Sequence, residues 1–356
     1  MKRYIAAVLL MTVLMCLLSG CKFWMDGEYF FEEPYDPEDS GTVKNAIVVS
    51  SYTQMRNAMV NLVETGAVSG IFDVSNFNGG SVRFFLDASI RYVKSSNPMG
   101  AYAVDSITYE MGTSTGEQAI ALDIRYRFDR AHIMKILRSY TMEEAKQSIV
   151  DALRTFSSGA VVRISRYEEM DFQNWIASYA LEYPDVIVEI PEVRTYLYPQ
   201  KGSDRIISFE FDYTYTTEEL RKMQEDINRT LNIFLHDMDR MTTDRERYAV
   251  LFNYLTGDGV FALDETNTPA YSVLVNKTGD SGAFASIYAV LCKKYGLECL
   301  TISGTCNDQP RTWNLIKIGE RYYHFDLLQA YQNGGFTTIS GDDLDEYIWD
   351  YGAYPN

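Results

Sequence analysis

Histidine and cysteine are scarce in this chain of 356 residues. Its three histidines lie far apart in the sequence, at His132, His236 and His324. Beyond residue 21 the chain has only three cysteines, Cys292, Cys299 and Cys306. Three thiols cannot all pair within one molecule, so we expect no disulfide framework. Their spacing does not match that of a zinc site. We therefore predict that the protein holds neither a metal ion nor another cofactor.

Basic residues are in the minority. The chain has 32 lysines and arginines against 49 aspartates and glutamates, which gives a formal net charge of −17. A surface of this sign repels phosphate groups, so it excludes nucleic acid as a partner. The acidic residues are spread along the chain, which is typical of a surface that keeps a protein soluble.

Long apolar runs are absent except at the start of the chain. After Met1, Lys2 and Arg3, an apolar run extends from Tyr4 to Leu18. A membrane-spanning helix needs about 20 apolar residues, so this run is short for one. A basic patch followed by a short apolar run is the layout of a secretory signal. We therefore exclude residues 1–20 from the folded protein.

The end of this run resembles the lipobox of bacterial lipoproteins. It reads Leu18-Ser19-Gly20-Cys21. The resemblance implies that Cys21 receives a diacylglycerol and becomes the first residue of the mature protein. More than one acyl chain gives stable anchoring, so we expect an extracytoplasmic protein held on the membrane by its N-terminal lipid. An ordinary signal peptide or an anchor helix that contains a cysteine is the alternative.

Residues 21–45 are predicted to be a linker that follows the lipidated cysteine. Seven acidic residues and two prolines crowd this segment, as in an extended spacer. It also holds several aromatic residues, including Trp24 and Phe30. These leave open that part of the linker packs on the folded body or at the membrane surface.

A weak internal repeat is visible within residues 46–230, and it predicts two similar α/β units. The first copy is expected to contain a helix at 55–63, a strand at 81–85, a helix at 87–93 and a closing strand at 119–128. The second is expected to contain a helix at 144–156, a strand at 160–164, a helix at 172–181 and a closing strand at 206–215. Both closing strands alternate apolar and polar residues with period two. One larger α+β domain is the alternative.

Residues 231–356 resemble the bacterial transglutaminase-like domain, which has a papain-like cysteine-protease architecture. Three segments carry the resemblance: Gly279-Asp280-Ser281 before a helix, Arg311-Thr312-Trp313-Asn314 on a strand, and His324-Phe325-Asp326 on the next strand. In that family Gly-x-Cys opens a helix, His-Ala-Trp-Asn follows on a strand, and an Asp closes the triad. The fold expected for the chain is therefore α+β. A tandem α/β region precedes a domain in which a helix packs on a small antiparallel sheet.

The catalytic residues of that family are not all present. Carried over by position, the nucleophile falls on Ser281, the histidine on Arg311 and the aspartate on Asp326. A serine needs an adjacent base, and an arginine cannot be deprotonated in a protein. Loss of such a catalytic unit lowers the catalytic rate about a million-fold in related triads. We therefore predict a pseudoenzyme in which Arg311 and Asp326 form a charge-assisted pair. A binding cleft would involve Ser281, Arg311, Trp313 and Asp326.

Two other chemical roles are weighed for this domain. A hydrolase or acyltransferase could use Ser281, or could use Cys306, which we place in the loop before Arg311. His324 is interpreted as a packing residue. The start of the helix at Asp280 to Gly282 could bind an anion through its backbone amides, or Ser281 could simply cap the helix.

The function expected from these features is binding or scaffolding in the cell envelope. The partner would be a peptide, a peptidoglycan stem or another protein, held by the former substrate cleft or by the tyrosine-rich surface. The alternative is that residues 46–230 carry the function and the last domain is only a structural cap.

Overall fold

The structure is a computed structural model of the chain. It describes residues 46–114, 117–238, 240–257, 264, 266–339 and 341–355. The predicted signal peptide, Cys21 and the segment 21–45 lie outside the described residues. Within the described ranges, no helix is both long enough and apolar enough to cross a membrane.

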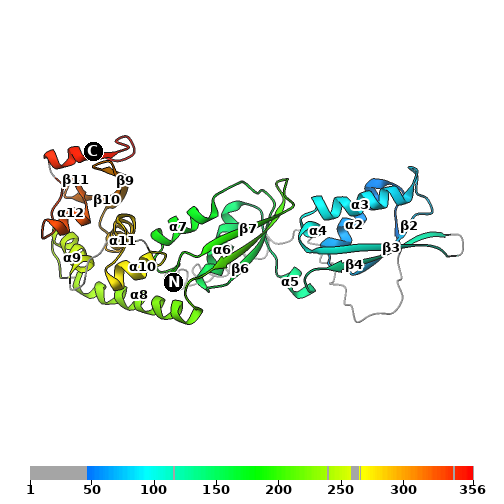
Figure 1. The fold of residues 1–356 in the computed structure, drawn as a ribbon, viewed down its shortest axis with the longest axis horizontal. Coiled ribbons are helices and arrows are strands. Elements are labelled where there is room, and N and C mark those ends of the chain that lie inside the picture. The colour runs from blue at the N-terminus through cyan, green and yellow to red at the C-terminus, as the bar shows by residue number, and fades with distance from the viewer. Residues whose placement is uncertain are drawn as a thin grey trace, which may run out of the picture.

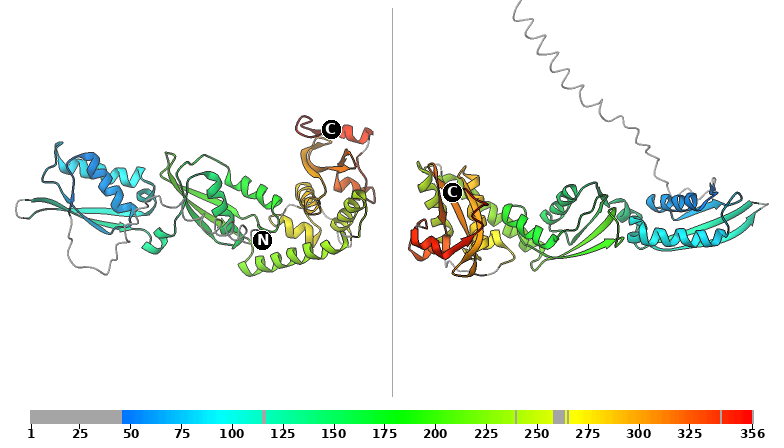
Figure 2. Two further views of the ribbon diagram at one scale, coloured as in Figure 1. Left: turned by 180° about the vertical axis from the view of Figure 1, so that it is seen from behind. Right: turned by 90° about the horizontal axis from the view of Figure 1, so that it is seen from above.

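The described residues form an α+β fold with three four-stranded sheets. Each sheet lies with its own helices, and the three groups follow one another in a row (Figure 1). The row has the same order when it is seen from behind and from above (Figure 2). The predicted fold class is therefore confirmed. We call the three groups the first unit, the second unit and the C-terminal domain.

The first unit has strand order β1-β2-β4-β3, in which β1 and β2 are parallel and the other neighbours antiparallel. Helices α2 and α3 supply Met55, Met59 and Leu86 to a core that they share with Phe72 and Ile120 of the sheet. Its elements are β1 (Ile47–Val48), α2 (Tyr52–Glu64), β2 (Ser69–Asp73), α3 (Val82–Ser96), α4 (Pro98–Ala103), β3 (Val104–Ser114) and β4 (Glu117–Tyr126).

The second unit has the strand order β5-β6-β8-β7 with the same sequence of pairing directions. Ile149, Ile176 and Phe209 lie in its core. Its elements are α5 (Arg130–Met134), β5 (Leu137–Ser139), α6 (Met142–Arg154), β6 (Gly159–Ile164), α7 (Phe172–Glu182), β7 (Glu192–Tyr198) and β8 (Arg205–Asp212).

One predicted strand of the first unit is wrong. Residues 81–85 cap and begin helix α3, and the strand of this unit that corresponds to β6 is β2. The Ser81 hydroxyl accepts a hydrogen bond from the Phe84 N–H at 3.4 Å, as an N-cap residue does. Leu86 and Val93 then bury one face of the helix at helical spacing. The predicted strand at 160–164 is confirmed as part of β6.

A partly buried arginine joins the first two units. The Arg163 guanidinium of β6 donates to Glu64 at the end of α2, from Nη1 to Oε2 at 2.6 Å. It also holds Asp204 through two bonds, at 3.0 and 2.8 Å. Its side chain is 14% exposed. Beside it, Ile206 of β8 is buried in the core of the first unit.

Helix α8 (Thr217–Met238) leads into the C-terminal domain. Leu220, Ile227 and Leu231 of this helix lie in the core of that domain. From the sequence, the boundary between the α/β region and the transglutaminase-like segment is expected between residues 230 and 231. This boundary therefore lies inside helix α8. The next elements are α9 (Asp244–Thr256), α10 (Pro269–Tyr271), a π-helix η1 (Ser272–Asn276) and α11 (Ser281–Lys294).

The sheet of the C-terminal domain has the order β11-β10-β9-β12, with antiparallel neighbours throughout. Helix α11 packs on β9 and β10 through residues such as Tyr288 and Leu291. Gly319 and Glu320 form a two-residue hairpin turn, because Ile318 pairs with Arg321. The elements are β9 (Cys299–Cys306), β10 (Gln309–Ile318), β11 (Arg321–Phe325), α12 (Leu327–Gln332), a 3-10 helix η2 (Gly341–Glu346) and β12 (Tyr347–Trp349).

Candidate functional site

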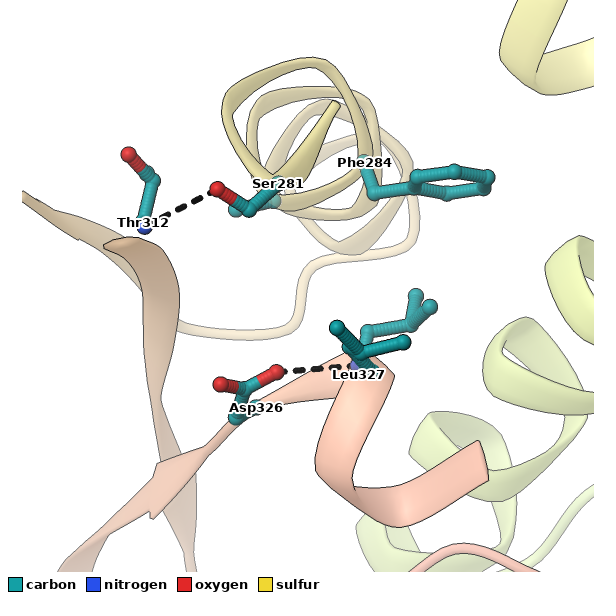
Figure 3. A pocket seen from close by; sticks show the side chains of 7 residues that line it. Ser281, Phe284, Thr312, Asp326 and Leu327 are labelled. Atoms are coloured by element: carbon teal, nitrogen blue, oxygen red, sulfur yellow. Dashed lines mark hydrogen bonds between the residues drawn. The ribbon is translucent and has the colours of Figure 1, made fainter. Parts of the chain in front are cut away.

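Ser281 is the first residue of helix α11 and faces strand β10. The residue that caps the helix is Asp280, whose carboxylate accepts from the Ala283 N–H at 2.7 Å. The Ser281 hydroxyl oxygen accepts a hydrogen bond from the backbone N–H of Thr312 at 3.2 Å (Figure 3). The serine therefore links the start of the helix to the neighbouring strand.

The N-terminus of α11 differs from both sequence-based interpretations. The cap is Asp280 rather than Ser281. An anion at this position would meet the negative charge of that carboxylate, which already occupies the Ala283 amide. The helix start is therefore poorly suited to an anion, although its backbone amides carry the positive end of the helix dipole.

Arg311 and Asp326 form the predicted pair. The Arg311 side chain donates from Nε to Oδ2 at 2.7 Å and from Nη2 to Oδ1 at 2.8 Å. This is the two-pronged geometry that makes arginine–carboxylate bonds strong. Burial lowers the pKa of Arg311, but the hydrogen bonds and the charge of Asp326 outweigh it, so the net pKa is raised. The arginine is charged at every physiological pH.

Asp326 is also the N-cap of helix α12 and is 2% exposed. Its carboxylate accepts from the backbone N–H groups of Leu328 at 2.9 Å and Gln329 at 3.3 Å. The Tyr347 hydroxyl on β12 donates to it at 2.9 Å. Burial, and then the negative charge of Asp326, raise the pKa of Tyr347, so its hydroxyl stays a donor. Four groups therefore share a single carboxylate.

The space between Ser281 and Asp326 is a cavity of about 10 Å³, room for roughly one water molecule. Besides Ser281 and Asp326, it is lined by Phe284, Ala285, Thr312, Leu327 and Leu328 (Figure 3). Trp313, which the sequence assigns to a cleft, does not line it. That side chain is 1% exposed and packs with Ile302 and Tyr347 in a separate cluster of the sheet.

The described histidine side chains make their hydrogen bonds elsewhere. His324 accepts from the Trp313 indole N–H at 3.0 Å, which agrees with a packing role, and burial lowers its pKa. His132 of α5 bonds the Tyr102 hydroxyl of the first unit at 2.9 Å. Neither imidazole bonds Ser281. Within the described ranges, no group of three or more histidine, cysteine or acidic residues could hold a metal ion.

Cys306 does not lie in a loop, as the sequence suggested. It is the last residue of β9 and pairs in register with Tyr347 of β12. The turn that follows consists of Asn307 and Asp308, both with positive φ. The thiol is not at a helix N-terminus, where a cysteine would become a stronger nucleophile.

Lys277 is a half-buried lysine that no sequence signal indicates. It ends the π-helix at φ 61°, and its Nζ lies 3.6 Å from the centre of the Tyr254 ring. The ammonium donates to the Leu274 carbonyl at 2.8 Å. Burial lowers the pKa of Lys277 to about 8. In the unfolded chain the pKa of Lys277 is about 10.4. Between about pH 8 and this value, the unfolded chain therefore binds more protons than the folded chain.

The stability of the folded protein is therefore expected to rise between about pH 8 and pH 10, relative to a Lys277→Met variant. The difference between the two proteins should be constant at lower pH, where the lysine is protonated in both states. Urea unfolding of both proteins across this range measures the effect. Equal pH profiles would show that Lys277 titrates normally.

One family model matches part of this chain. Residues 235–327 match the model of the transglutaminase-like superfamily. The C-terminal part of the chain therefore carries a transglutaminase-like domain. No curated protein matches the chain.

Two solved structures are similar to this chain at low identity. One is a transglutaminase at 11% identity and a TM-score of 0.26, with 58% of this chain and 62% of that one covered. The chain thus spans less than two thirds of the length of this relative. The other is a Cytophaga hutchinsonii protein described as a candidate cysteine protease, at 10% identity and a TM-score of 0.23. In that comparison 44% of this chain and 68% of the other are covered.

Proposed function

We propose that this protein is a lipid-anchored component of the cell envelope whose transglutaminase-like domain binds a partner without catalysing a reaction. Cys21 would hold it on the membrane, outside the cytoplasm. The partner class is a peptide, a peptidoglycan stem or another protein.

The observation that carries the proposal is the position of Arg311. Its guanidinium occupies both oxygens of Asp326, the carboxylate that would otherwise orient a catalytic imidazole. Arg311 cannot accept the proton of a nucleophile. The hydroxyl of Ser281 accepts from a backbone amide, and this contact does not remove its proton.

The energetics of the pair favour a structural role. A carboxylate with four donors stabilises the junction between β10, α12 and β12. A cavity of about 10 Å³ has no room for a peptide side chain. Partner binding is therefore expected on another surface of the protein.

The test is an assay of amide hydrolysis and of amine transfer to a glutamine-containing peptide. We expect no activity from residues 22–356 of the natural chain. The double variant Ser281→Cys with Arg311→His serves as the comparison, because it restores a thiol and a base. Activity gained by the double variant alone would show that substrate can still enter. Turnover by the natural chain would refute the proposal.

A further inference from the structure

Strand β9 has an outer edge that is only partly paired. In the C-terminal sheet, β12 pairs with residues Gly304 to Cys306 and then ends at Trp349. The Lys317 N–H donates to the Glu298 carbonyl at 3.1 Å, which places the backbone groups of even-numbered β9 residues toward β10. The odd-numbered residues therefore direct their N–H and C=O groups to the other side. Thr305 faces β12 in this way.

Ser303 and Thr301 continue this outward-facing row beyond the end of β12. Among the residues that the structure describes, none pairs with their outward backbone groups. The chain turns away after Trp349, where the Ala353 N–H donates to the Asp350 carbonyl at 3.2 Å. An unpaired stretch of strand is a template for an added strand.

A groove of about 550 Å³ runs beside this edge. Its apolar part is formed by Leu181 of α7 and by Ala289 and Val290 of α11. Cys299, Leu300 and Thr301 line its border with the sheet. Leu300 is 37% exposed on β9. An extended chain on this edge would place alternate side chains on the two faces of the sheet, one set in the groove and one beside Leu300.

The charge of the protein selects among extended peptides. Glu182, Glu298 and Lys293 line the groove, and Glu298 is already paired with Lys317 at 3.1 Å. The whole chain carries a formal charge of −17. The long-range field of the negatively charged chain therefore favours a cationic peptide.

From these features we infer that the free edge of β9 binds an extended peptide of alternating basic and apolar residues by adding a strand next to Thr301 and Ser303. Strand addition of this kind draws its affinity from main-chain hydrogen bonds and its specificity from pockets for alternate side chains. The short strand β12 already uses the same edge of the sheet. This inference rests on the proposed binding role and gives that role a surface and a class of partner.

The experiment measures binding of a synthetic peptide of alternating lysine and leucine to residues 22–356. We expect hydrogen exchange at residues 299–304 to slow when the peptide binds. The same peptide N-methylated at alternate residues is the matched probe, because it keeps the charge and loses the strand-forming N–H groups. Loss of about two hydrogen bonds should weaken binding about tenfold. A glutamate-leucine peptide should bind more weakly still.

A variant of the protein provides the reciprocal test. Ser303→Pro removes the outward N–H, which an edge position tolerates, whereas Ser303→Ala keeps it. We expect about threefold weaker binding for the proline variant, which loses one hydrogen bond, and little change for the alanine variant. Alkylation of Cys299 should slow when the peptide is bound, and alkylation of Cys306 should not.

Three results would overturn the inference: no binding of the basic peptide, equal binding of the N-methylated peptide, or protection that excludes residues 299–304. These outcomes are separate from failure of the proposed function. Amide hydrolysis by the natural chain would remove the non-catalytic role and leave the binding result at β9 unchanged.

Discussion

Replacing Asp326 with alanine is expected to lower the free energy of unfolding of the C-terminal domain by about 3–5 kcal/mol. The substitution leaves the Arg311 guanidinium, which is 16% exposed, without its carboxylate. It also removes the N-cap of α12 and the acceptor of the Tyr347 hydroxyl. Urea unfolding followed by tryptophan fluorescence measures the loss, because Trp313 and Trp349 lie in this domain.

Two further variants separate the contributions at this site. Asp326→Asn keeps an acceptor for the helix amides but loses the charge. It should therefore lower the free energy of unfolding by less than Asp326→Ala does. Arg311→Met leaves Asp326 with Tyr347 and two backbone amides, and we expect a loss of about 1–2 kcal/mol. A smaller effect for Asp326→Ala than for Arg311→Met would contradict the idea that the carboxylate is the centre of the network.

Replacing Arg163 with alanine should destabilise the contact between the first and second units by about 1.5–3 kcal/mol, the range for hydrogen bonds to charged groups. This arginine is the partner of both Glu64 and Asp204, so its removal leaves two carboxylates next to each other. Asn97 and Arg138 still contact Glu64 and will offset part of the loss. Urea unfolding measures the stability, and small-angle X-ray scattering measures whether the two units separate.

Arg194 offers a matched control on the same sheet. It also contacts two carboxylates, Glu210 at 3.8 Å and Asp212 at 3.3 Å, but its side chain is 52% exposed. Exposed ion pairs contribute about 0–1 kcal/mol, so Arg194→Ala should change stability little. If both alanine variants had equal effects, burial would not be the property that makes Arg163 important.

The sequence predicts the elements whose pattern is local. The capping box at Thr243 and Glu246, which begins α9, is such a pattern, because both of its hydrogen bonds lie within one helical turn. The alternating strands at 119–128 and 206–215 coincide closely with β4 and β8. The strand predicted at 81–85 failed because a short apolar run suits either a strand or one face of a helix. The N-cap at Ser81 stabilises the start of the helix and so favours the helical conformation.

The candidate site was only partly predictable. The pairing of Arg311 with Asp326 follows from their places in the motif, and the structure confirms it. Tyr347 could not be identified in this way, because it reaches Asp326 from a strand 21 residues further along the chain. The backbone contact from Thr312 to Ser281 depends on how α11 lies against β10, which no local pattern specifies.

The size of the cavity could not be predicted from the sequence either. Trp313 belongs to the motif of a catalytic cleft, but the alternation of side chains along β10 directs it into the cluster with Ile302 and Leu315. Thr312, its neighbour, lines the cavity instead. Whether a cleft is open or filled depends on packing by Phe284, Leu327 and Leu328, whose positions follow from the tertiary fold.

The most direct measurement compares the natural chain with its Ser281→Ala and Cys306→Ala variants in one amide-hydrolysis assay. We expect all three proteins to be equally inactive, because neither Ser281 nor Cys306 is paired with a described imidazole and Arg311 occupies Asp326. Hydrolysis by the natural chain that is lost in Ser281→Ala would identify a serine nucleophile, and loss in Cys306→Ala would identify a thiol. Either result would contradict a structural role for this site.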